Sequence, residues 1–313
     1  MTRSRHMLPA AITTAEYEAL RSDPQRWEPV LADIAEAHGL GRSELRAVGD
    51  GSNLVARLGD DLVIKLFPPL MRHQYESERL TLRHLQGQLS TLIPEIVIDG
   101  ETSGWPYLVM TRLEGVSLSA VWGECTEEEK RSILYSMGRL TAEVQAVPPG
   151  PLTALEPEWK GFMAGQAKKC RSHHERSGLA LHLLDQIDPY LEKTRSVLPE
   201  SFQPAILTGE YTPGNLLMTR QGGSWQISGL IDFGDVMVGF SEYDLLGPTT
   251  FLTSGAEQVR ALLDGFGYDG PAATRGLGQR LMRMLLLHRF SRLVKWQDRV
   301  RSFDELERLL WPL

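Results

Sequence analysis

The stretch Thr208-Gly209-Glu210-Tyr211-Thr212-Pro213-Gly214-Asn215, followed by Asp232-Phe233-Gly234-Asp235, is the part of the sequence that decides the fold. The first segment places the carboxylate of Glu210 five residues before the amide of Asn215. The second opens with the carboxylate of Asp232, directly after an apolar run that is typical of a strand. Phosphoryl transfer needs a carboxylate that accepts a hydroxyl proton, together with amide and carboxylate oxygens that bind magnesium. We therefore predict that Glu210 is the catalytic base and that Asn215 and Asp232 are catalytic metal ligands.

A strand with a single lysine, Asp61-Leu62-Val63-Ile64-Lys65-Leu66-Phe67, lies upstream of these loops. Because side chains alternate along a strand, Lys65 shares a face with Val63 and Phe67, and this face is expected to line a nucleotide site. In the helix predicted over residues 71–89, Glu78 lies on the apolar stripe and is the expected partner of Lys65. The alternative is a solvated lysine on an edge strand, with Glu78 as a surface charge.

Two further segments are predicted to contact a nucleotide. In the glycine-rich turn Gly49-Asp50-Gly51-Ser52-Asn53, Gly51 and Ser52 are expected to bring backbone N–H groups near phosphates. The alternative for this turn is a plain hairpin connection. At the end of the last strand of the sheet, backbone groups of Thr111 and Leu113 occupy the position of a kinase hinge and are expected to face the purine. The alternative there is a strand-to-helix connector.

The order of these segments predicts an α+β, bilobal, protein-kinase-like fold. Residues 1–112 would form N-terminal helices and a small antiparallel-sheet lobe that binds the nucleotide. Residues 113–313 would form a larger, mainly helical lobe with the catalytic loop, the metal loop and the acceptor site. A capping box formed by Thr126 and Glu129 marks the start of a long helix in this second lobe. Neither a dinucleotide-binding fingerprint nor a P-loop occurs in the sequence.

Residues 208–217 resemble the His-Gly-Asp-x-x-x-x-Asn loop of the aminoglycoside phosphotransferase family, and residues 231–235 are similar to its Asp-Phe-x-Asp metal loop. The likeness extends to the hygromycin B kinases of this family and covers nearly the whole chain. It includes Trp27-Glu28-Pro29, Val63-Ile64-Lys65-Leu66-Phe67, Trp105-Pro106-Tyr107-Leu108-Val109-Met110 and Leu309-Leu310-Trp311-Pro312. The resemblance implies a kinase that uses ATP or GTP with Mg²⁺ and phosphorylates a hydroxyl of an aminoglycoside or aminocyclitol such as hygromycin B. Antibiotic resistance is the role associated with this activity.

The catalytic loop departs from the family pattern at two positions, because Thr208 replaces the histidine and Glu210 replaces the catalytic aspartate. The extra methylene of Glu210 moves the carboxylate by about 1 Å unless the loop compensates, and a displacement of that order costs roughly a hundredfold in rate. Phosphoryl transfer depends mostly on positioning and charge stabilisation and not on a strong base, so Glu210 is expected to support catalysis. Two alternatives remain open: a non-catalytic nucleotide-binding regulatory module, and a kinase for choline, an amino acid or a macrolide.

Three carboxylates close to the metal loop are candidates for contacting a cationic acceptor: Asp235, Glu242 and Asp244. The alternative for Asp235 and Glu242 is a solvent-facing loop carboxylate. The alternative for Asp244 is a carboxylate at a helix start, where it interacts with free N–H groups.

A group of histidines, His173, His174 and His182, falls in a polar stretch that is predicted to be helical. No acidic or thiolate residue lies at a metal-binding spacing from them, so we expect solvated histidines. His288 lies at helical spacing from apolar residues and is expected to be a hydrogen-bonded core histidine.

The composition is that of a folded globular protein, since 42% of the 313 residues are hydrophobic and 23% are charged. The net charge of −7 argues against a nucleic-acid partner and favours a cationic one. No apolar run is long enough to cross a membrane, and residues 1–10 lack the hydrophobic core of a signal peptide, so we predict no membrane association and a cytoplasmic location. Cys125 and Cys170 form neither a metal pattern nor a disulfide framework, in agreement with a reducing compartment.

Overall fold

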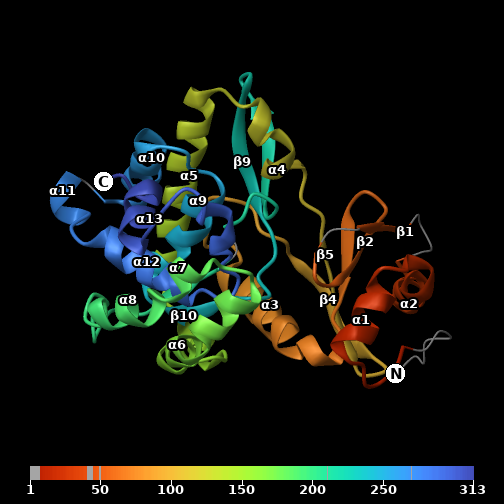
Figure 1. The fold of residues 1–313 in the computed structure, drawn as a ribbon. Coiled ribbons are helices and arrows are strands. Elements are labelled where there is room, and N and C mark those ends of the chain that lie inside the picture. Colours follow the sequence, from red (N-terminus) through yellow and green to blue (C-terminus); the bar gives the residue numbers. More distant parts are fainter. Residues whose placement is uncertain (1–7, 41–44, 49–50, 210, 269) are drawn as a thin grey trace. The chain divides into compact units, whose positions relative to one another are not determined.

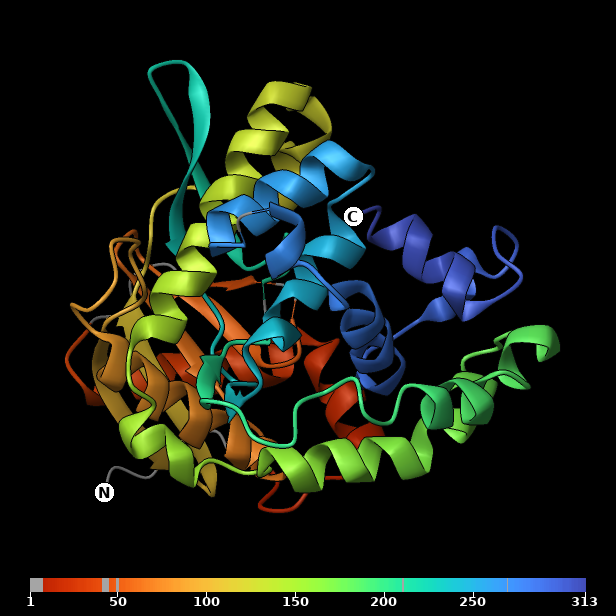
Figure 2. The same cartoon turned by 90° about the vertical axis from the view of Figure 1, so that its left-hand side faces the viewer.

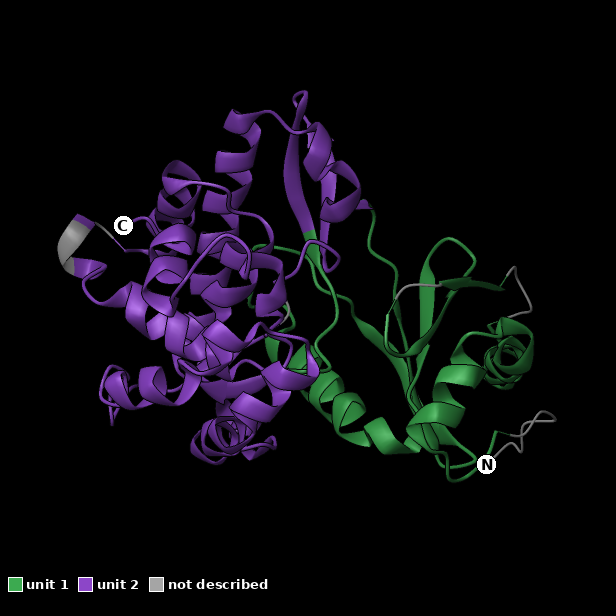
Figure 3. Cartoon of the chain, viewed as in Figure 1, with its two compact units in different colours: residues 1–115, 229–235 green, residues 116–228, 236–313 purple. Residues whose placement is uncertain are grey.

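The computed structural model describes residues 8–40, 45–48, 51–209, 211–268 and 270–313 (Figure 1). The chain divides into two compact units (Figure 3). Unit 1 comprises Met1–Gly115 and Gly229–Asp235, and unit 2 comprises Val116–Ser228 and Val236–Leu313. The prediction places the metal loop in the second lobe, whereas the contacts of residues 229–235 place them in unit 1.

An antiparallel sheet formed by five strands of the described residues lies at the centre of unit 1, in the order β1-β2-β3-β5-β4. The strands are β1 (Leu45–Val48), β2 (Leu54–Leu58), β3 (Leu62–Leu66), β4 (Ile96–Thr102) and β5 (Trp105–Thr111). Strand β3 pairs on both sides, so that Lys65 lies opposite Val55 on β2 and Leu108 on β5. Lys65 is therefore on a central strand, and the alternative of an edge-strand lysine is wrong.

Helices cover both faces of this sheet. They are α1 (Thr14–Arg21), α2 (Pro24–Ala37), the 3₁₀ turn η1 (Pro69–Met71) and α3 (Arg72–Leu85). Tyr17 of α1 and Trp27 of α2 share one apolar cluster with Ile64 and other sheet residues. Because side chains alternate along β3, Lys65 points to the opposite face from Ile64, where α3 supplies Glu78. Figure 1 shows α1 and α2 in red and α3 in orange around the strands.

The β4–β5 hairpin turns at Ser103 and Gly104, both of which have positive φ angles, 53° and 85°. Two positive φ angles match the twist of the flanking strands in a two-residue hairpin turn. This turn extends the pairing of β4 and β5 to Thr102 and Trp105.

Unit 2 is mainly helical among the described residues. Its helices are α4 (Leu118–Val121), α5 (Glu127–Ala146), α6 (Trp159–Arg176), α7 (Leu181–Leu184), α8 (Ile187–Lys193), α9 (Leu246–Phe251), α10 (Ala256–Phe266), α11 (Gly270–Ala273), α12 (Leu277–Leu287) and α13 (Phe303–Leu310). The 3₁₀ turns are η2 (Trp122–Glu124), η3 (Gly150–Ala154), η4 (Ser241–Leu245) and η5 (Leu293–Trp296). The strands β6 (Val116–Ser117), β8 (Leu216–Gln221) and β9 (Ser224–Leu230) form one small sheet, and β7 (Ala205–Leu207) with β10 (Met237–Gly239) form another.

Helices α5 and α10 pack very closely, and Figure 2 shows them side by side in yellow-green and blue. A Cβ atom on Gly138 of α5 would lie 2.1 Å from the carbonyl oxygen of Leu262, and one on Gly265 of α10 would lie 2.0 Å from that of Tyr135. The two backbones can therefore approach to this distance only because both positions lack a side chain.

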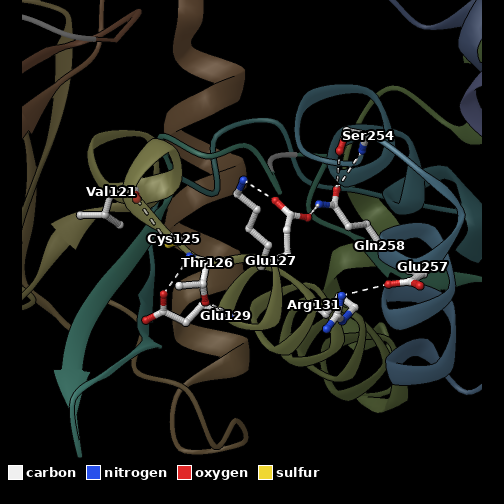
Figure 4. A network of polar contacts seen from close by, with 10 residues as sticks. Val121, Cys125, Thr126, Glu127, Glu129, Arg131, Ser254, Glu257 and Gln258 are labelled. Carbon is white, nitrogen blue, oxygen red and sulfur yellow. Dashed lines mark hydrogen bonds and ion pairs between the residues drawn. The ribbon is translucent and has the colours of Figure 1, made fainter.

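A polar network joins the N-termini of α5 and α10 (Figure 4). Thr126 and Glu129 form the predicted capping box, which is confirmed. Glu127 accepts a hydrogen bond from Gln258 Nε2 on α10, and the side-chain Oε1 of Gln258 accepts from Ser254 N. The first turn of α5 is thus bonded to the helix that it packs against.

Two features shorten the helices of unit 2. Residues 181–193 form two helices, α7 and α8, because Pro189 has no N–H group to continue the ladder and is accommodated in the first turn of a new helix. Helix α12 ends at Leu287. There the carbonyl groups of Leu286 and Leu287 accept hydrogen bonds from side chains of α6 instead of from the next helical turn.

Candidate active site

Lys65, Glu78 and Asp232 form an ion cluster within unit 1. The Nζ atom of Lys65 donates to Glu78 Oε2 at 2.6 Å and to Asp232 Oδ1 at 2.9 Å. Lys65 and Glu78 are 6% and 1% exposed, whereas 36% of the Asp232 side chain is exposed. The buried carboxylate therefore holds the lysine in place, and Asp232 is the member of the cluster that solvent or a ligand can reach.

Asp232 has a strained backbone, with a φ angle of 68° in the left-handed region. Few non-glycine residues adopt this conformation, which costs on the order of 1–3 kcal/mol and clusters at functional sites. The following residues are bonded to unit 1, since Ser77 Oγ on α3 donates to Phe233 O at 3.1 Å. Gly234 packs against Gln74, where an added Cβ would lie 3.3 Å from the Gln74 Cβ. The loop 232–234 is therefore held in a conformation that directs the Asp232 carboxylate to Lys65.

The three charges of this cluster shift one another's pKa values. Burial alone would lower the pKa of Lys65, but Asp232 and Glu78 together raise it above its ordinary value. Burial also opposes ionisation of Asp232, yet the nearby Lys65 ammonium lowers the pKa of this carboxyl. Burial raises the pKa of Glu78, and Lys65 offsets part of this effect. At neutral pH the cluster therefore presents a fixed ammonium and an ionised Asp232.

The glycine-rich turn is bonded to helix α1 in unit 1. The described part of the turn begins at Gly51, because Gly49 and Asp50 lie outside the described residues. The Tyr17 hydroxyl donates to the Ser52 carbonyl oxygen at 2.7 Å, and Arg21 Nη1 donates to that of Gly51 at 2.7 Å. Gly51 has a φ angle of 119°, which a residue with a side chain rarely adopts. Helix α1 thus fixes the backbone of the turn that is predicted to contact phosphates.

Gln74 on α3 links the glycine-rich turn to the metal loop within unit 1. Its side-chain oxygen accepts from Asn53 Nδ2 at 3.3 Å, and its Nε2 donates to Asp235 Oδ1 at 3.4 Å. Asp235, predicted to contact an acceptor, is thus half-buried and bonded to α3. Its role toward an acceptor stays a prediction.

The backbone N–H groups of the expected hinge segment differ in whether they are hydrogen-bonded. Thr111 N donates to Glu95 O at 2.9 Å, and Arg112 N donates to Asp61 O at 2.7 Å. Within the part of the chain that the structure describes, Leu113 N has no hydrogen-bond acceptor. Leu113 is therefore the residue of this segment whose N–H group is available to a ligand, whereas that of Thr111 is used within the sheet.

The predicted catalytic loop connects β7 to β8 in unit 2. Glu210 lies outside the described residues, so its position stays a prediction. Asn215 is half-buried, and its backbone N–H donates to Thr212 O at 3.1 Å. The loop is further held at Pro213, whose carbonyl oxygen accepts from Ser119 N at 2.9 Å. Asn215 therefore ends a turn that is bonded at several points to unit 2.

Asp244 holds the start of this loop. It is 3% exposed, and its two oxygens accept hydrogen bonds from Thr208 N at 2.9 Å and Gly209 N at 2.8 Å. Burial raises the pKa of Asp244 to about 7, against the opposing effect of these two N–H groups. The side chain thus bonds N–H groups of the catalytic loop and not those of its own helix start, and its buried oxygens disagree with the predicted contact to an acceptor.

Glu242 differs from both expectations for it. It is 2% exposed, and its oxygens accept from Arg280 Nη2 and Nε at 2.6 and 2.7 Å and from the Tyr268 hydroxyl at 2.7 Å. A bidentate guanidinium contact neutralises the carboxylate and uses both oxygens. This disagrees with the prediction of a free carboxylate that attracts a cationic acceptor. The sequence does not reveal the pairing, since Arg280 lies on a helix 38 residues further along the chain.

The structure also shows positioning residues that the sequence reasoning missed, namely Tyr17, Arg21 and Gln74. Nothing in the helical period of residues 13–39 indicates that the Tyr17 hydroxyl reaches a carbonyl oxygen 35 residues away. Gln74 carries no charge and belongs to no motif. Only the packing of α1 and α3 around the sheet brings these side chains to the predicted loops.

Comparison with known proteins defines the class. Residues 44–277 match the profile of the phosphotransferase enzyme family. This match covers more than half of the chain, which therefore belongs to that family. The predicted kinase-like fold is also confirmed by solved structures.

One such structure is the GDP complex of wild-type aminoglycoside 2'-phosphotransferase-IIIa, with a TM-score of 0.69 and 16% identity over 90% of this chain and 96% of that one. A second is the streptomycin-ATP-APH(2")-IIa ternary complex, with a TM-score of 0.60 and 20% identity over 83% and 91% of the two chains. A third is macrolide 2'-phosphotransferase MphH from Brachybacterium faecium, with a TM-score of 0.58 and 20% identity over 91% and 98%. At these identities the similarity establishes the fold. Among the described residues, every helix is too short or too polar to span a membrane.

Proposed function

We propose that this protein transfers the γ-phosphoryl group of a nucleoside triphosphate to a hydroxyl group of a small molecule. The observation that carries the proposal is the cluster in which the buried Lys65 is held between Glu78 and the strained Asp232. A fixed ammonium beside an accessible carboxylate suits a site for phosphates and their metal ion. Membership of the phosphotransferase family supports the same conclusion.

Each residue of the site has a role in this proposal. Lys65, oriented by Glu78, would contact the nucleotide phosphates, and the backbone at Gly51 and Ser52 would cover them. In the transfer, the acceptor hydroxyl gives its proton to Glu210 while its oxygen forms a bond to the γ-phosphorus. The bond from that phosphorus to the bridging oxygen breaks, and the nucleoside diphosphate leaves with both electrons of that bond.

The residues also fit a magnesium ion. Mg²⁺ binds through one or two protein oxygens together with nucleotide phosphates and does not need a cage of protein ligands. The described residues contain no group of three or more His, Cys, Asp and Glu side chains that could hold a metal ion, in keeping with this mode of binding. Asp232 would supply one oxygen and Asn215 another, and the bound ion would neutralise phosphate charge.

The donor is ATP or GTP in this proposal, and Leu113 N–H would donate a hydrogen bond to the purine. The lack of an acceptor for Leu113 N among the described residues supports this contact. Structural relatives contain GDP, ATP or ADP by their names, so the fold accommodates either purine. The proposal places the protein in the cytoplasm, where both nucleotides occur.

The acceptor is a hydroxylated small molecule, and the sequence resemblance makes hygromycin B the first compound to assay. Structural relatives are complexes with streptomycin, gentamicin or kanamycin, or are named for a macrolide. If an antibiotic of this kind is the acceptor, its phosphorylation would give resistance.

Consumption of ATP and of GTP is expected in the presence of an accepted compound and Mg²⁺, with a product about 80 Da heavier than the acceptor, the mass that one phosphoryl group adds. The measurement is coupled nucleotide hydrolysis against a panel of hydroxylated acceptors, followed by mass spectrometry. Thermal stabilisation by nucleotide without a phosphorylated product from any acceptor would instead support the non-catalytic nucleotide-binding module.

Tyr17→Phe is expected to raise the KM for nucleotide about fivefold while kcat changes little, since loss of one hydrogen bond of roughly 1 kcal/mol loosens the glycine-rich turn. The measurement is initial rate against nucleotide concentration. Tyr135→Phe is the matched control, because Tyr135 is 45% exposed and lies in unit 2. An unchanged KM in Tyr17→Phe would show that α1 does not position the turn for nucleotide.

A further inference from the structure

Unit 2 contains a cavity of about 80 Å³ between α6 and the end of α12. Its lining includes the side chains of Lys169, His173, Arg176, His288 and Arg289 and contains no acidic residue. The whole chain has a net charge of −7, whereas the charged side chains that line this cavity are all basic. A concave site with several basic groups attracts anions.

Two of these cations have no acidic partner among the residues that the structure describes. Within the described residues, Lys169 and Arg176 take part in no ion pair, although both are exposed at the cavity. By contrast, the nearby Arg171 is paired with Asp185 at 3.0 Å. The charges of Lys169 and Arg176 are therefore available to a ligand.

The carbonyl groups at the end of α12 are used by α6. Gln166 Nε2 donates to Leu287 O at 3.0 Å, and His174 Nε2 donates to Leu286 O at 3.0 Å. Free carbonyl groups at a helix C-terminus favour cations. The carbonyl oxygens of Leu286 and Leu287 are already hydrogen-bonded. They therefore reduce the positive potential of the cavity less than free carbonyl groups would.

Two buried polar atoms beside the cavity lack a hydrogen bond among the described residues, His174 Nδ1 and Ser291 Oγ. His174 is fully buried, which corrects the expectation of a solvated histidine, and burial lowers the pKa of its imidazole. Since Nε2 donates to Leu286 O, the neutral ring leaves Nδ1 as an acceptor. Ser291 is bonded through its carbonyl oxygen to the lining residue His173 at 3.0 Å. Both residues lie next to the lining residue His173, but neither lines the cavity itself.

A ring stack and the following residue link the cavity to the catalytic loop. The imidazole of His288 stacks on Tyr243, with ring centroids 5.0 Å apart and an interplanar angle of 22°. The next residue is Asp244, which bonds Thr208 N and Gly209 N of the loop. His288 of the cavity thus contacts the residue that directly precedes the carboxylate bonded to the loop carrying Glu210.

We infer that this cavity binds an oxyanion, a carboxylate or a phosphate, on the acceptor molecule. The inference rests on the proposed function, because it assigns a chemical class to the acceptor of that reaction. It differs from the cationic acceptor that the sequence predicts. Of the acidic residues expected to attract such a cation, Glu242 is neutralised by Arg280 and Asp244 is buried against the loop.

Binding is tested with inorganic phosphate and with acetate as separate probes, at constant ionic strength. The imidazole NMR signals of His173 and His288 are expected to shift saturably. In the Lys169→Gln, Arg176→Gln double variant the apparent affinity is expected to fall about tenfold, as loss of two partly exposed charges implies. Lys168→Gln is the matched control, since Lys168 is exposed on the same helix and does not line the cavity. Equal shifts in the wild type and the double variant would overturn the site.

Turnover distinguishes the acceptor classes. Gluconate is compared with sorbitol and glucose 6-phosphate with glucose, so that a carboxylate and a phosphate are each matched to a neutral polyol or sugar. We expect at least one anionic compound to have a kcat/KM about tenfold above its neutral partner, and the double variant to lose this preference. Transfer to hygromycin B or kanamycin but to neither anionic compound would overturn this inference and leave the proposed function intact. Anion binding without nucleotide consumption by any acceptor would overturn both.

Discussion

Asp232→Asn is expected to lower phosphoryl transfer by on the order of a thousandfold, which is the effect of removing one group that stabilises charge in such reactions. The substitution replaces the charged oxygen offered to the metal ion by a neutral amide, and hard divalent cations prefer carboxylates. Asparagine is the appropriate replacement because it tolerates the left-handed backbone of residue 232, whereas alanine would add strain. The measurement is kcat/KM for the best acceptor.

Thermal unfolding of the same variant shows whether the loss is chemical. The introduced amide oxygen can still accept a hydrogen bond from Lys65, as the Asp232 carboxylate does, so the melting temperature is expected to change little. Asp264→Asn removes an exposed carboxylate from α10 and is the control for loss of charge. Turnover near the wild-type value in Asp232→Asn would refute the assignment of Asp232 as a metal ligand.

Asp244→Asn is expected to lower kcat about a hundredfold, which is the cost of displacing a reacting group by about 1 Å. The amide keeps one acceptor oxygen, but its NH₂ group cannot accept from the second loop N–H, so either Thr208 N or Gly209 N loses its partner. Leaving a buried N–H unpaired also destabilises the fold by roughly 1–3 kcal/mol. Initial rates and chemical denaturation measure the two effects. A wild-type kcat would show that Asp244 does not position the loop.

The stability difference between the wild type and Asp244→Asn is also expected to depend on pH. The pKa of Asp244 is raised from 3.8 to about 7 in the folded protein, so the folded state binds more protons than the unfolded state between these values. The contribution of Asp244 is therefore fully present below about pH 4 and is lost as the pH rises through about 7. The advantage of the wild type should be largest near the lower of these values and shrink by about pH 8. Denaturation midpoints at these two extremes test this, and a constant difference would contradict the raised pKa.

Local periodicity was sufficient to predict the part of the site that lies on regular elements. Alternation along β3 and the helical period of α3 predict that Lys65 and Glu78 meet, and the structure brings their charges to 2.6 Å. The capping box at Thr126 is likewise a pattern of neighbouring residues. In each case the geometry of one strand or helix determines which side chains share a face.

Partners that come from distant parts of the chain could not be predicted in this way. Glu242 has the sequence features of a loop carboxylate, and only the packing of α12 supplies Arg280 to it. The hydroxyl of Tyr17 and the carboxylate of Asp244 form hydrogen bonds with backbone groups. Every residue type has such groups, so the sequence does not indicate which of them is the partner. Such contacts depend on tertiary structure, so the sequence alone predicts a solvent or acceptor contact for the acidic residues near the metal loop.

The close contact between Gly138 and Gly265 has a consequence for laboratory evolution of this protein. Neither position can accept even a methyl group unless α5 and α10 move apart, because the opposing backbone carbonyl oxygens lie 2.1 and 2.0 Å from the added carbon. In a randomised library selected for soluble expression, both codons should stay fixed while the exposed neighbours vary. Recombination with a homologue whose helices are more widely separated at this crossing would have to exchange both helices together.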